Sequence, residues 1–244
     1  MASMHMMNPQ HFLRTTATLI IVWSSTGLNA RAETEKPAAA SEPPAVTEYM
    51  GRKVAQTMHW TGAEWLVRHK REQEEASSLM REKLGLKPGM MVCDMGCGNG
   101  YHTFPIAKAV APDGKVYGVE IQEPYLKMLD ENAKKENVTN FVPVLGLTYD
   151  PKLPENTLDM ILLVDVYHEF DHPSEMLKAM HKSLKPDGTI VFIEFRGEDE
   201  SVPIKPEHKM TKVQLTKELT ANGFKLVKEF DGLPWQHMMW FGRQ

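Results

Sequence analysis

The chain has 244 residues, of which 42% are hydrophobic and 25% charged, a balance typical of one globular domain with additional terminal sequence. The formal net charge is −4, and Lys and Arg form no cluster. Because neutralisation of phosphates supplies most of the affinity for nucleic acids, this charge argues against nucleic-acid binding and favours a small-molecule partner.

The first 46 residues are predicted to lie outside the folded domain. Residues 1–6, MASMHM, resemble a cloning scar, which places the natural start at Met7. In residues 7–32 an arginine precedes an apolar stretch and Ala-Arg-Ala ends it, which is the order of a secretory signal peptide. The apolar stretch is too short to cross a bilayer comfortably. We therefore expect export to the periplasm or the medium, with residues 33–46 as a Pro/Ala-rich linker.

Other interpretations of this leader stay open. It contains two arginines, many Ser and Thr, and no acidic residue before Glu33, which is also typical of an organelle transit peptide. An uncleaved anchor is a third reading, and a chain that keeps its start near Met7 would be cytoplasmic. Without residues 1–32, 26 basic and 32 acidic residues remain, so the charge becomes −6.

The domain itself is predicted to span residues 47–244 and to begin with helices over 47–86. The stretches TEYMGRKVAQTM and TGAEWLVRHKREQEEASSLMREKLGL are each expected to be helical. Thr61, with Glu64 three residues later, has the pattern of a helix cap, and Gly85 marks the end of the second helix.

Strand and helix signals alternate after Gly89. This alternation predicts an α/β fold of the Rossmann-like kind, with a mostly parallel sheet and helices on both faces. The last two strands are joined by the short link DGLPW, so they are expected to pair as an antiparallel hairpin. Strands are predicted at 90–95, 115–120, 140–145, 158–165, 189–195, 225–230 and 236–242, and helices at 100–110, 123–136, 173–184 and 211–221.

A glycine-rich turn, DMGCGNG, connects the first of these strands to a helix. Such a turn lets a ligand approach the backbone near a helix N-terminus. A dinucleotide fingerprint would place glycine at 101, where Tyr101 stands, and Asp94 would repel a pyrophosphate but suits an ammonium group. The only cysteines, Cys93 and Cys97, lack the further ligands that a zinc site needs, so no metal is expected there.

Glu120 ends the next strand, 20 residues beyond the last glycine of the turn. An acid in this place can accept hydrogen bonds from both ribose hydroxyls. Ribose, an ammonium group and no phosphate together describe S-adenosyl-L-methionine (SAM), which is the cofactor that the sequence predicts.

The chain resembles the class I SAM-dependent methyltransferases in the successive motifs VCDMGCGNG, VYGVE, TLDMILLVDVYHEF and LKPDGTIVFIEF. The resemblance covers about residues 87–244 and is closer to a group that carries DVYHEF, VPIKPEHKMT and LPWQH segments. It implies a seven-stranded sheet whose cofactor lies under a lid formed by the leading helices. It also implies a cofactor site at Asp94, Gly96, Gly98, Gly100, Glu120, Ile121 and Asp165, with Thr148 standing where many members have an acid for the adenine amine.

The segment HEFDH offers a rival function, because His168, Glu169 and His172 match the HExxH pattern of zinc peptidases. That chemistry requires both histidines on one face of a helix. Pro173 disfavours helical backbone at His172 and is itself favoured as a first helical residue, so the motif is expected to be a loop. The sequence therefore predicts no metal ligand here.

Catalytic candidates gather where ligands bind in open α/β sheets, at the carboxyl edge. His168 is the first choice for a base, because its ordinary pKa lies near neutrality. The predicted set is His168, Tyr167, Asp165, Tyr101, His208 and His237.

The function that the sequence predicts is transfer of the SAM methyl group to a small molecule by in-line displacement, at a thiol, amine or hydroxyl. Catalysis of this kind depends heavily on positioning the acceptor at the methyl group. A zinc peptidase and a SAM-binding module without turnover remain the alternatives.

Overall fold

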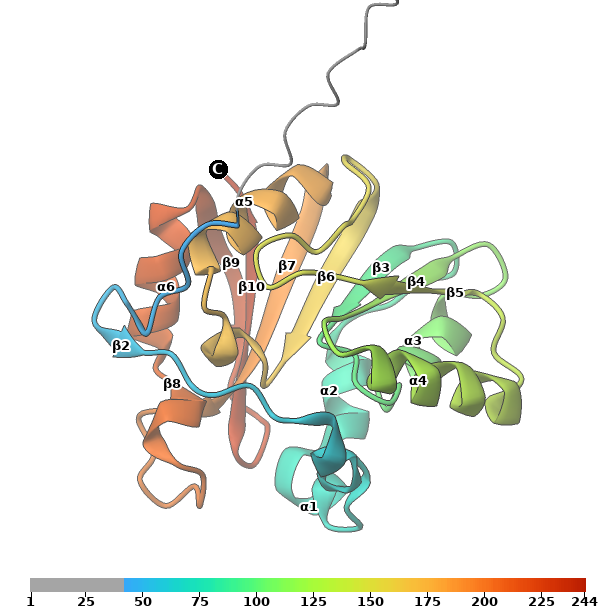
Figure 1. The fold of residues 1–244 in the computed structure, drawn as a ribbon, viewed down its shortest axis with the longest axis horizontal. Coiled ribbons are helices and arrows are strands. Elements are labelled where there is room, and N and C mark those ends of the chain that lie inside the picture. Colours follow the sequence, from blue (N-terminus) through green and yellow to red (C-terminus); the bar gives the residue numbers. More distant parts are fainter. Residues whose placement is uncertain (1–41) are drawn as a thin grey trace, which may run out of the picture. The chain divides into compact units, whose positions relative to one another are not determined.

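The central sheet contains eight strands, seven of which follow the order β5-β4-β3-β6-β7-β10-β9 (Figure 1). The strands from β5 to β7 are parallel, and β10 is antiparallel to both β7 and β9. The predicted sheet and its final hairpin are thus confirmed. The bounds are β3 Met91–Met95, β4 Lys115–Glu120, β5 Phe141–Leu145, β6 Leu158–Val164, β7 Leu184–Arg196, β9 Phe224–Phe230 and β10 Gln236–Arg243.

This computed structural model describes residues 42–244. The predicted cloning scar, the signal peptide and most of the linker lie outside the described residues. The end of the linker is extended, and the Val46 amide donates to the Asp171 carbonyl at 2.8 Å. Within the described part of the chain, no helix combines the length and the apolar character that a membrane crossing requires.

The strand order reverses between β3 and β6. The chain builds β3, β4 and β5 in one direction and then returns to place β6 on the other side of β3. In open α/β sheets, ligands bind at the carboxyl ends of the strands beside such a reversal. The topology therefore places the candidate site at the ends of β3, β4 and β6.

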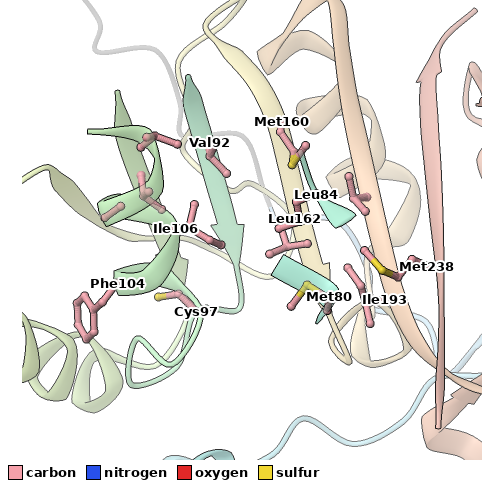
Figure 2. Close-up of a cluster of buried hydrophobic side chains, with 14 of the residues drawn as sticks. Met80, Leu84, Val92, Cys97, Phe104, Ile106, Met160, Leu162, Ile193 and Met238 are labelled. Carbon is pink, nitrogen blue, oxygen red and sulfur yellow. The ribbon is translucent and has the colours of Figure 1, made fainter. Parts of the chain in front are cut away.

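The sheet is buried on both faces, as expected for near-continuous apolar strands. Because side chains alternate along a strand, neighbouring residues join opposite cores: Val92 and Leu162 belong to one, whereas Cys93 and Leu163 belong to the other. Figure 2 shows part of the first core, where Ile106 lies beside Val92.

Helices cover the two faces in pairs. α3 (Thr103–Val110) and α4 (Glu123–Glu136) contribute to the first core, and α5 (Pro173–Ser183) and α6 (Lys212–Ala221) contribute to the second. All four were predicted within a few residues. A short strand, β8 (Lys209–Met210), pairs with β7 in addition.

The prediction of a helix over residues 47–58 is wrong. The segment forms a two-stranded ribbon, β1 (Glu48–Tyr49) and β2 (Arg52–Lys53), around a turn in which Met50 and Gly51 both have positive φ angles. Two successive residues of this kind form the turn that suits a tight hairpin. The ribbon is held by contacts far away in sequence, including an Arg52–Glu218 ion pair at 2.8 Å, which local helical patterns do not reveal.

The second predicted helix is broken into three pieces: a 3-10 helix, η1 (Trp60–Val67), and two short α-helices, α1 (Arg71–Glu75) and α2 (Ser77–Lys83). Ala76 is left-handed, with φ of 48°, and separates the last two. The predicted cap at Thr61 is wrong as well, because His59 caps η1. The predicted end at Gly85 is correct, since that residue follows α2 with φ of 67°.

Residues 54–60, which we call the crossing segment, run over the carboxyl ends of the strands (Figure 1). The Ala55 amide donates to the His168 carbonyl at 2.9 Å at one end. At the other, the Trp60 amide donates to Gln122 Oε1 at 2.9 Å, and Gln122 Nε2 donates to the Met58 carbonyl at 2.8 Å. The N-terminal region therefore passes over this edge of the sheet, but as a segment without regular secondary structure and not as the predicted helices.

Candidate functional site

The glycine turn after β3 brings its backbone close to two neighbouring segments. Gly96 and Gly98 have φ angles of 69° and 52°. A Cβ at Gly96 would lie 2.5 Å from Val166 Cγ2, and one at Gly98 would lie 2.6 Å from Leu66 Cδ1. Both conformation and space therefore require glycine at these two positions.

Glu120, at the end of β4, holds this turn from the side. Its Oε2 accepts a hydrogen bond from the Gly98 amide at 3.2 Å, and its Oε1 accepts from the Ile121 and Gln122 amides at 2.8 and 3.0 Å. Burial raises the pKa of the Glu120 carboxyl, and the three amide donors act in the opposite direction. The carboxylate is thus fixed at the edge of the turn.

A first cavity opens at the ends of β3, β4 and β6. It is lined by most of the residues that were predicted to hold the cofactor, namely Gly96, Gly98, Glu120, Ile121, Thr148 and Asp165.

Asp94 and Gly100 do not line this cavity. Asp94 is buried behind the turn, where its Oδ2 accepts a hydrogen bond from Thr103 Oγ1 at 2.6 Å. Burial raises the pKa of its carboxyl to about 6. Gly100 packs against Phe104 and Leu129. In this structure these two residues support the turn from behind, and their contact with the cofactor stays a prediction.

A second cavity lies beside the first, under the crossing segment and the loop that follows β7. Asp165 and Glu169 line both cavities, and so do Met58 and Leu66 from the N-terminal region. The two cavities therefore meet at a boundary with two carboxyl groups. The second cavity is further lined by Arg71, Glu75, His168, Phe195, Lys205, Glu207 and His208, among others.

Asp165, which follows β6, has an unusual backbone and an unpaired oxygen. Its φ of 51° is rare for a residue other than glycine. Gln236 Nε2 donates to its Oδ2 at 2.6 Å, whereas the buried Oδ1 has no hydrogen-bond partner. Burial, with Glu75 and Glu194 adding repulsion, raises the pKa of this carboxyl well above its ordinary value. A cation bound here would satisfy the unpaired oxygen and favour the ionised form.

His168 lies on a single 3-10 turn, η2 (Tyr167–Glu169), directly after β6. Its Nδ1 is 2.6 Å from Glu194 Oε2, and the other oxygen of Glu194 accepts from the Tyr167 amide at 3.0 Å. Burial lowers the pKa of the His168 ring, but the Glu194 carboxylate outweighs it, so the net shift is upward.

His208 also lines the second cavity, next to the ring of His168. It ends η3 (Pro206–His208), and its Nδ1 is 3.2 Å from His168 Nε2. The neighbouring residue Lys209 pairs with Phe195 of β7, which fixes the place of η3 at the sheet. The sequence thus identified two histidines that the fold brings together across 40 residues.

Glu169 stands at the boundary between the cavities. The Met58 amide donates to its Oε1 at 3.2 Å. Burial raises the pKa of its carboxyl to about 7, while His168 acts in the opposite direction. A partly buried carboxyl in a cavity with a pKa raised this far is a candidate for a functional group.

Tyr167 does not reach either cavity, so its predicted catalytic place is wrong. The ring is fully buried against Phe170 and Phe192. Its hydroxyl donates to Glu218 Oε2 at 2.6 Å. These contacts make Tyr167 part of the core below the site.

Tyr101 and His237 also lie outside the cavity walls, contrary to the prediction. The guanidinium of Arg71 stacks 4.2 Å from the Tyr101 ring centre. His237 is completely buried on β10, and its ring nitrogens have no hydrogen-bond partner. Burial lowers the pKa of this ring, which fits a neutral imidazole packed in the sheet.

The HExxH pattern is not a helical zinc site. His168 belongs to η2, whereas His172 precedes α5, which begins at Pro173 as predicted. Both ring nitrogens of His172 are engaged, Nδ1 with Asp171 Oδ1 at 2.7 Å and Nε2 with the Pro43 carbonyl at 2.8 Å. The two histidines therefore serve different parts of the fold.

Sequence reasoning missed several wall residues that come from the N-terminal region. The structure brings Thr57, Met58 and Leu66 to both cavities, and Trp65 and Arg71 to the second alone. Most of these residues lie in the apolar stretch MHWTGAEWLV, and no residue of η1 within this stretch is buried. A regular helix over the stretch would have turned different side chains toward the cavities.

The chain matches a known protein family. Residues 86–239 match the profile of the family described as "Methyltransferase domain". The demethylmenaquinone methyltransferase of Geobacillus stearothermophilus is 26% identical over 136 residues, which are 56% of this chain and 58% of that protein. The chain spans about half the length of the curated relatives it matches.

Solved structures share the fold. A SAM-dependent methyltransferase from Aquifex aeolicus superposes with a TM-score of 0.72 at 22% identity, over 77% of this chain and 100% of that one. The magnesium protoporphyrin IX methyltransferase of Synechocystis PCC 6803, solved with bound SAM, gives 0.55 at 18% identity, over 75% and 84%.

The residues of the first cavity fit SAM. The molecule carries a ribose diol, an ammonium group and a cationic sulfonium. Glu120 offers a fixed carboxylate to a diol, and Asp165 offers an unpaired carboxylate oxygen to a cation. Gly96 and Gly98 leave the backbone open where a side chain would collide. Because the matched profile spans more than half of the chain, the protein belongs to the methyltransferase domain family, and its cofactor is SAM.

Proposed function

We propose that the protein transfers a methyl group from SAM in the first cavity to a small molecule in the second. The observation that carries this proposal is the meeting of the two cavities at Asp165 and Glu169. A donor and an acceptor bound on either side of this boundary would be held against each other, and such positioning supplies most of the rate gain in a displacement reaction.

Three features of the first cavity would hold SAM, which supplies an electrophilic methyl group when bound. Glu120 accepts hydrogen bonds from the ribose, in addition to the amides it already binds. The Gly96–Gly98 backbone lies along the methionine end. Asp165 balances positive charge with its unpaired Oδ1.

The second cavity is shaped for a small acceptor. The crossing segment and Leu66 line it from the N-terminal side. The names of two relatives, a demethylmenaquinone and a magnesium protoporphyrin IX methyltransferase, support a small-molecule acceptor. Its reacting group is a thiol, an amine or a hydroxyl.

His168 is the residue that we propose to act on the acceptor. Glu194 fixes the ring through Nδ1, which leaves Nε2 on the side of His208 and the second cavity. Nδ1 therefore orients the ring, and Nε2 is the nitrogen that faces the acceptor. Imidazoles that take part in proton transfer or ligation have this arrangement.

The direct test is formation of S-adenosylhomocysteine when the full chain is incubated with SAM and a panel of thiols, amines and hydroxy compounds. We expect turnover with at least one class. His168→Ala should lower turnover roughly 10²-fold or more while SAM affinity changes little. His172→Ala, the matched control, should have a much smaller effect, because its ring is engaged by Asp171 and Pro43.

Two results would contradict the proposal. A protein that binds SAM tightly but methylates no member of the panel would be a binding module. Equal losses of turnover in the His168 and His172 variants would mean that His168 has no special place at the acceptor.

A further inference from the structure

Three side chains around the second cavity stand close enough to share one ligand. His168 and Glu169 come from η2 and His208 from η3. One nitrogen or oxygen atom from each lies within 4.8 Å of the others, and within residues 42–244 this is the one group of three or more His, Cys, Asp or Glu residues with such spacing. All three residues line the second cavity.

We propose that His168, Glu169 and His208 bind a divalent transition-metal ion. Two imidazoles and one carboxylate form the protein ligand set of zinc and iron(II) sites that keep coordination positions open for water or a substrate. Atoms within 4.8 Å of one another need only a small contraction to surround one ion, since metal–nitrogen bonds of about 2.0–2.1 Å place ligands somewhat over 3 Å apart.

The hydrogen bonds of His168 prepare it as a ligand. The Glu194 carboxylate can only accept at pH 7, so the 2.6 Å contact places the ring proton of His168 on Nδ1. In the neutral ring Nε2 then carries the lone pair, which accepts a hydrogen bond from His208 Nδ1 at 3.2 Å, and a metal ion would take the place of that shared proton. A carboxylate behind a histidine is the usual support of a metal-binding imidazole.

The other two ligands are also held in place. The Met58 amide fixes Glu169 through Oε1 and leaves the remaining lone pairs of the carboxylate available. His208 is anchored by its own amide, which donates to the Lys205 carbonyl at 3.0 Å, and by the pairing of Lys209 with Phe195. The two imidazole rings are nearly perpendicular, at 84°. The site therefore needs no rearrangement of the backbone to form.

Carboxyl groups stand near the cluster. The wall of the second cavity contains Asp165 and Glu207 in addition to Glu169, together with Lys205. Glu194 adds a further carboxyl group behind His168, whereas Glu75 is already paired with Arg68 and Arg71.

This site differs from the zinc site that the HExxH pattern suggests. His172 takes no part, because Asp171 and Pro43 occupy both of its ring nitrogens. The third ligand comes instead from His208, 40 residues along the chain. The sequence could not reveal this set, since only the fold places η3 beside η2.

The ion would define the class of acceptor. A hydroxyl or thiol compound in the second cavity would coordinate one open position and lose its proton to water at near-neutral pH, because a bound metal lowers the pKa of its ligand. The lone pair left on oxygen or sulfur then attacks the methyl carbon as the carbon–sulfonium bond breaks. This consequence rests on the proposed function, whereas the binding of the ion does not.

The test is titration of tag-free, chelator-treated full-length protein with Co²⁺, read by its visible absorption, and with Zn²⁺, read by equilibrium dialysis and elemental analysis. We expect one ion per chain. His208→Ala and Glu169→Gln should each weaken binding at least tenfold, because loss of one of three protein ligands removes a direct bond. His172→Ala should keep the wild-type stoichiometry and spectrum, and circular dichroism should show that all three variants are folded.

The outcomes separate this proposal from the methyl-transfer proposal. No stoichiometric ion in the wild type, or unchanged binding in His208→Ala, would overturn the metal site. Loss of binding in His172→Ala would assign the ion to the HExxH pair instead. Calorimetry with SAM on the same samples tests the cofactor site independently, so an ion that binds without SAM would leave the metal site standing and reject the methyl-transfer proposal.

Discussion

Asp94 is a residue whose burial costs stability. Its carboxyl lies behind the glycine turn with one side-chain donor, Thr103, and its pKa is raised to about 6 against an ordinary 3.8. Below pH 3.8 the carboxyl is neutral in both folded and unfolded chains, so it costs nothing. Between pH 3.8 and 6 the unfolded chain releases the proton while the fold retains it, so stability falls as the pH rises.

Asp94→Asn should therefore make the SAM-free protein more stable at pH 7.5, by about 1–3 kcal/mol, because the neutral amide avoids the cost of a buried charge. The gain should grow as the pH rises from 4 to 6 and then level off. Urea unfolding at several pH values measures it. Thr103→Ser, which keeps the hydroxyl donor, is the matched control and should resemble the wild type. A variant less stable than the wild type at pH 7.5 would mean that the ionised carboxylate is well supported.

At the scale of elements, the sheet and its four major helices could be predicted from the sequence, because their signals are local. Fully apolar strands such as β6 and the Pro173 start of α5 reflect burial and backbone preference within a few residues. The β1–β2 ribbon and the broken helices after it could not be predicted, because their hydrogen bonds and ion pairs join positions far apart in sequence.

Arg52 anchors the β1–β2 ribbon to α6 and to η2. Its Nε donates to Glu218 Oε1 at 2.8 Å, and one of its terminal nitrogens donates to the His168 carbonyl at 3.1 Å. Glu218 is completely buried and also accepts from Tyr167 and Gln214. The ribbon therefore supplies the positive charge that a buried carboxylate of α6 needs.

Arg52→Ala should destabilise the fold by about 3 kcal/mol, since it leaves a buried carboxylate without its counter-charge. The double variant Arg52→Ala/Glu218→Gln should recover part of that loss, because the neutral amide needs no counter-charge. Thermal unfolding of the single and double variants gives both values. If the double variant is as unstable as the sum of two independent losses, the ion pair is not what holds the ribbon.

At the scale of the whole molecule, the candidate site was predicted in part. Glu120 and the glycines of the turn could be predicted, because an apolar strand that ends in glycines or in an acidic residue can be recognised from neighbouring residues alone. The second cavity could not be foreseen, because η2, η3 and the crossing segment come together only in the folded chain. The wrong placement of Tyr167 has the same origin: its position beside His168 does not reveal which way the 3-10 turn directs each ring.

A separate prediction concerns processing of the N-terminal segment, residues 7–32. We propose that it is a signal peptide cleaved after Ala32, so the mature protein should begin at Glu33. N-terminal sequencing of protein made in its own host measures this directly. A mature chain that starts near Met7 would exclude export by this signal and place the protein in the cytoplasm, where SAM is made.

The central claim is that the first cavity binds SAM through Glu120. Calorimetric titration of the full chain with SAM tests it most directly, with Glu123→Ala as the matched control, because that carboxylate is exposed on the next helix and pairs only with Lys127. We predict one site per chain and an affinity at least tenfold weaker in Glu120→Ala, since a buried hydrogen bond to a charged group contributes roughly 1.5–3 kcal/mol. The control should bind as the wild type does. Wild-type affinity in Glu120→Ala, or no binding to the wild-type chain, would contradict the account.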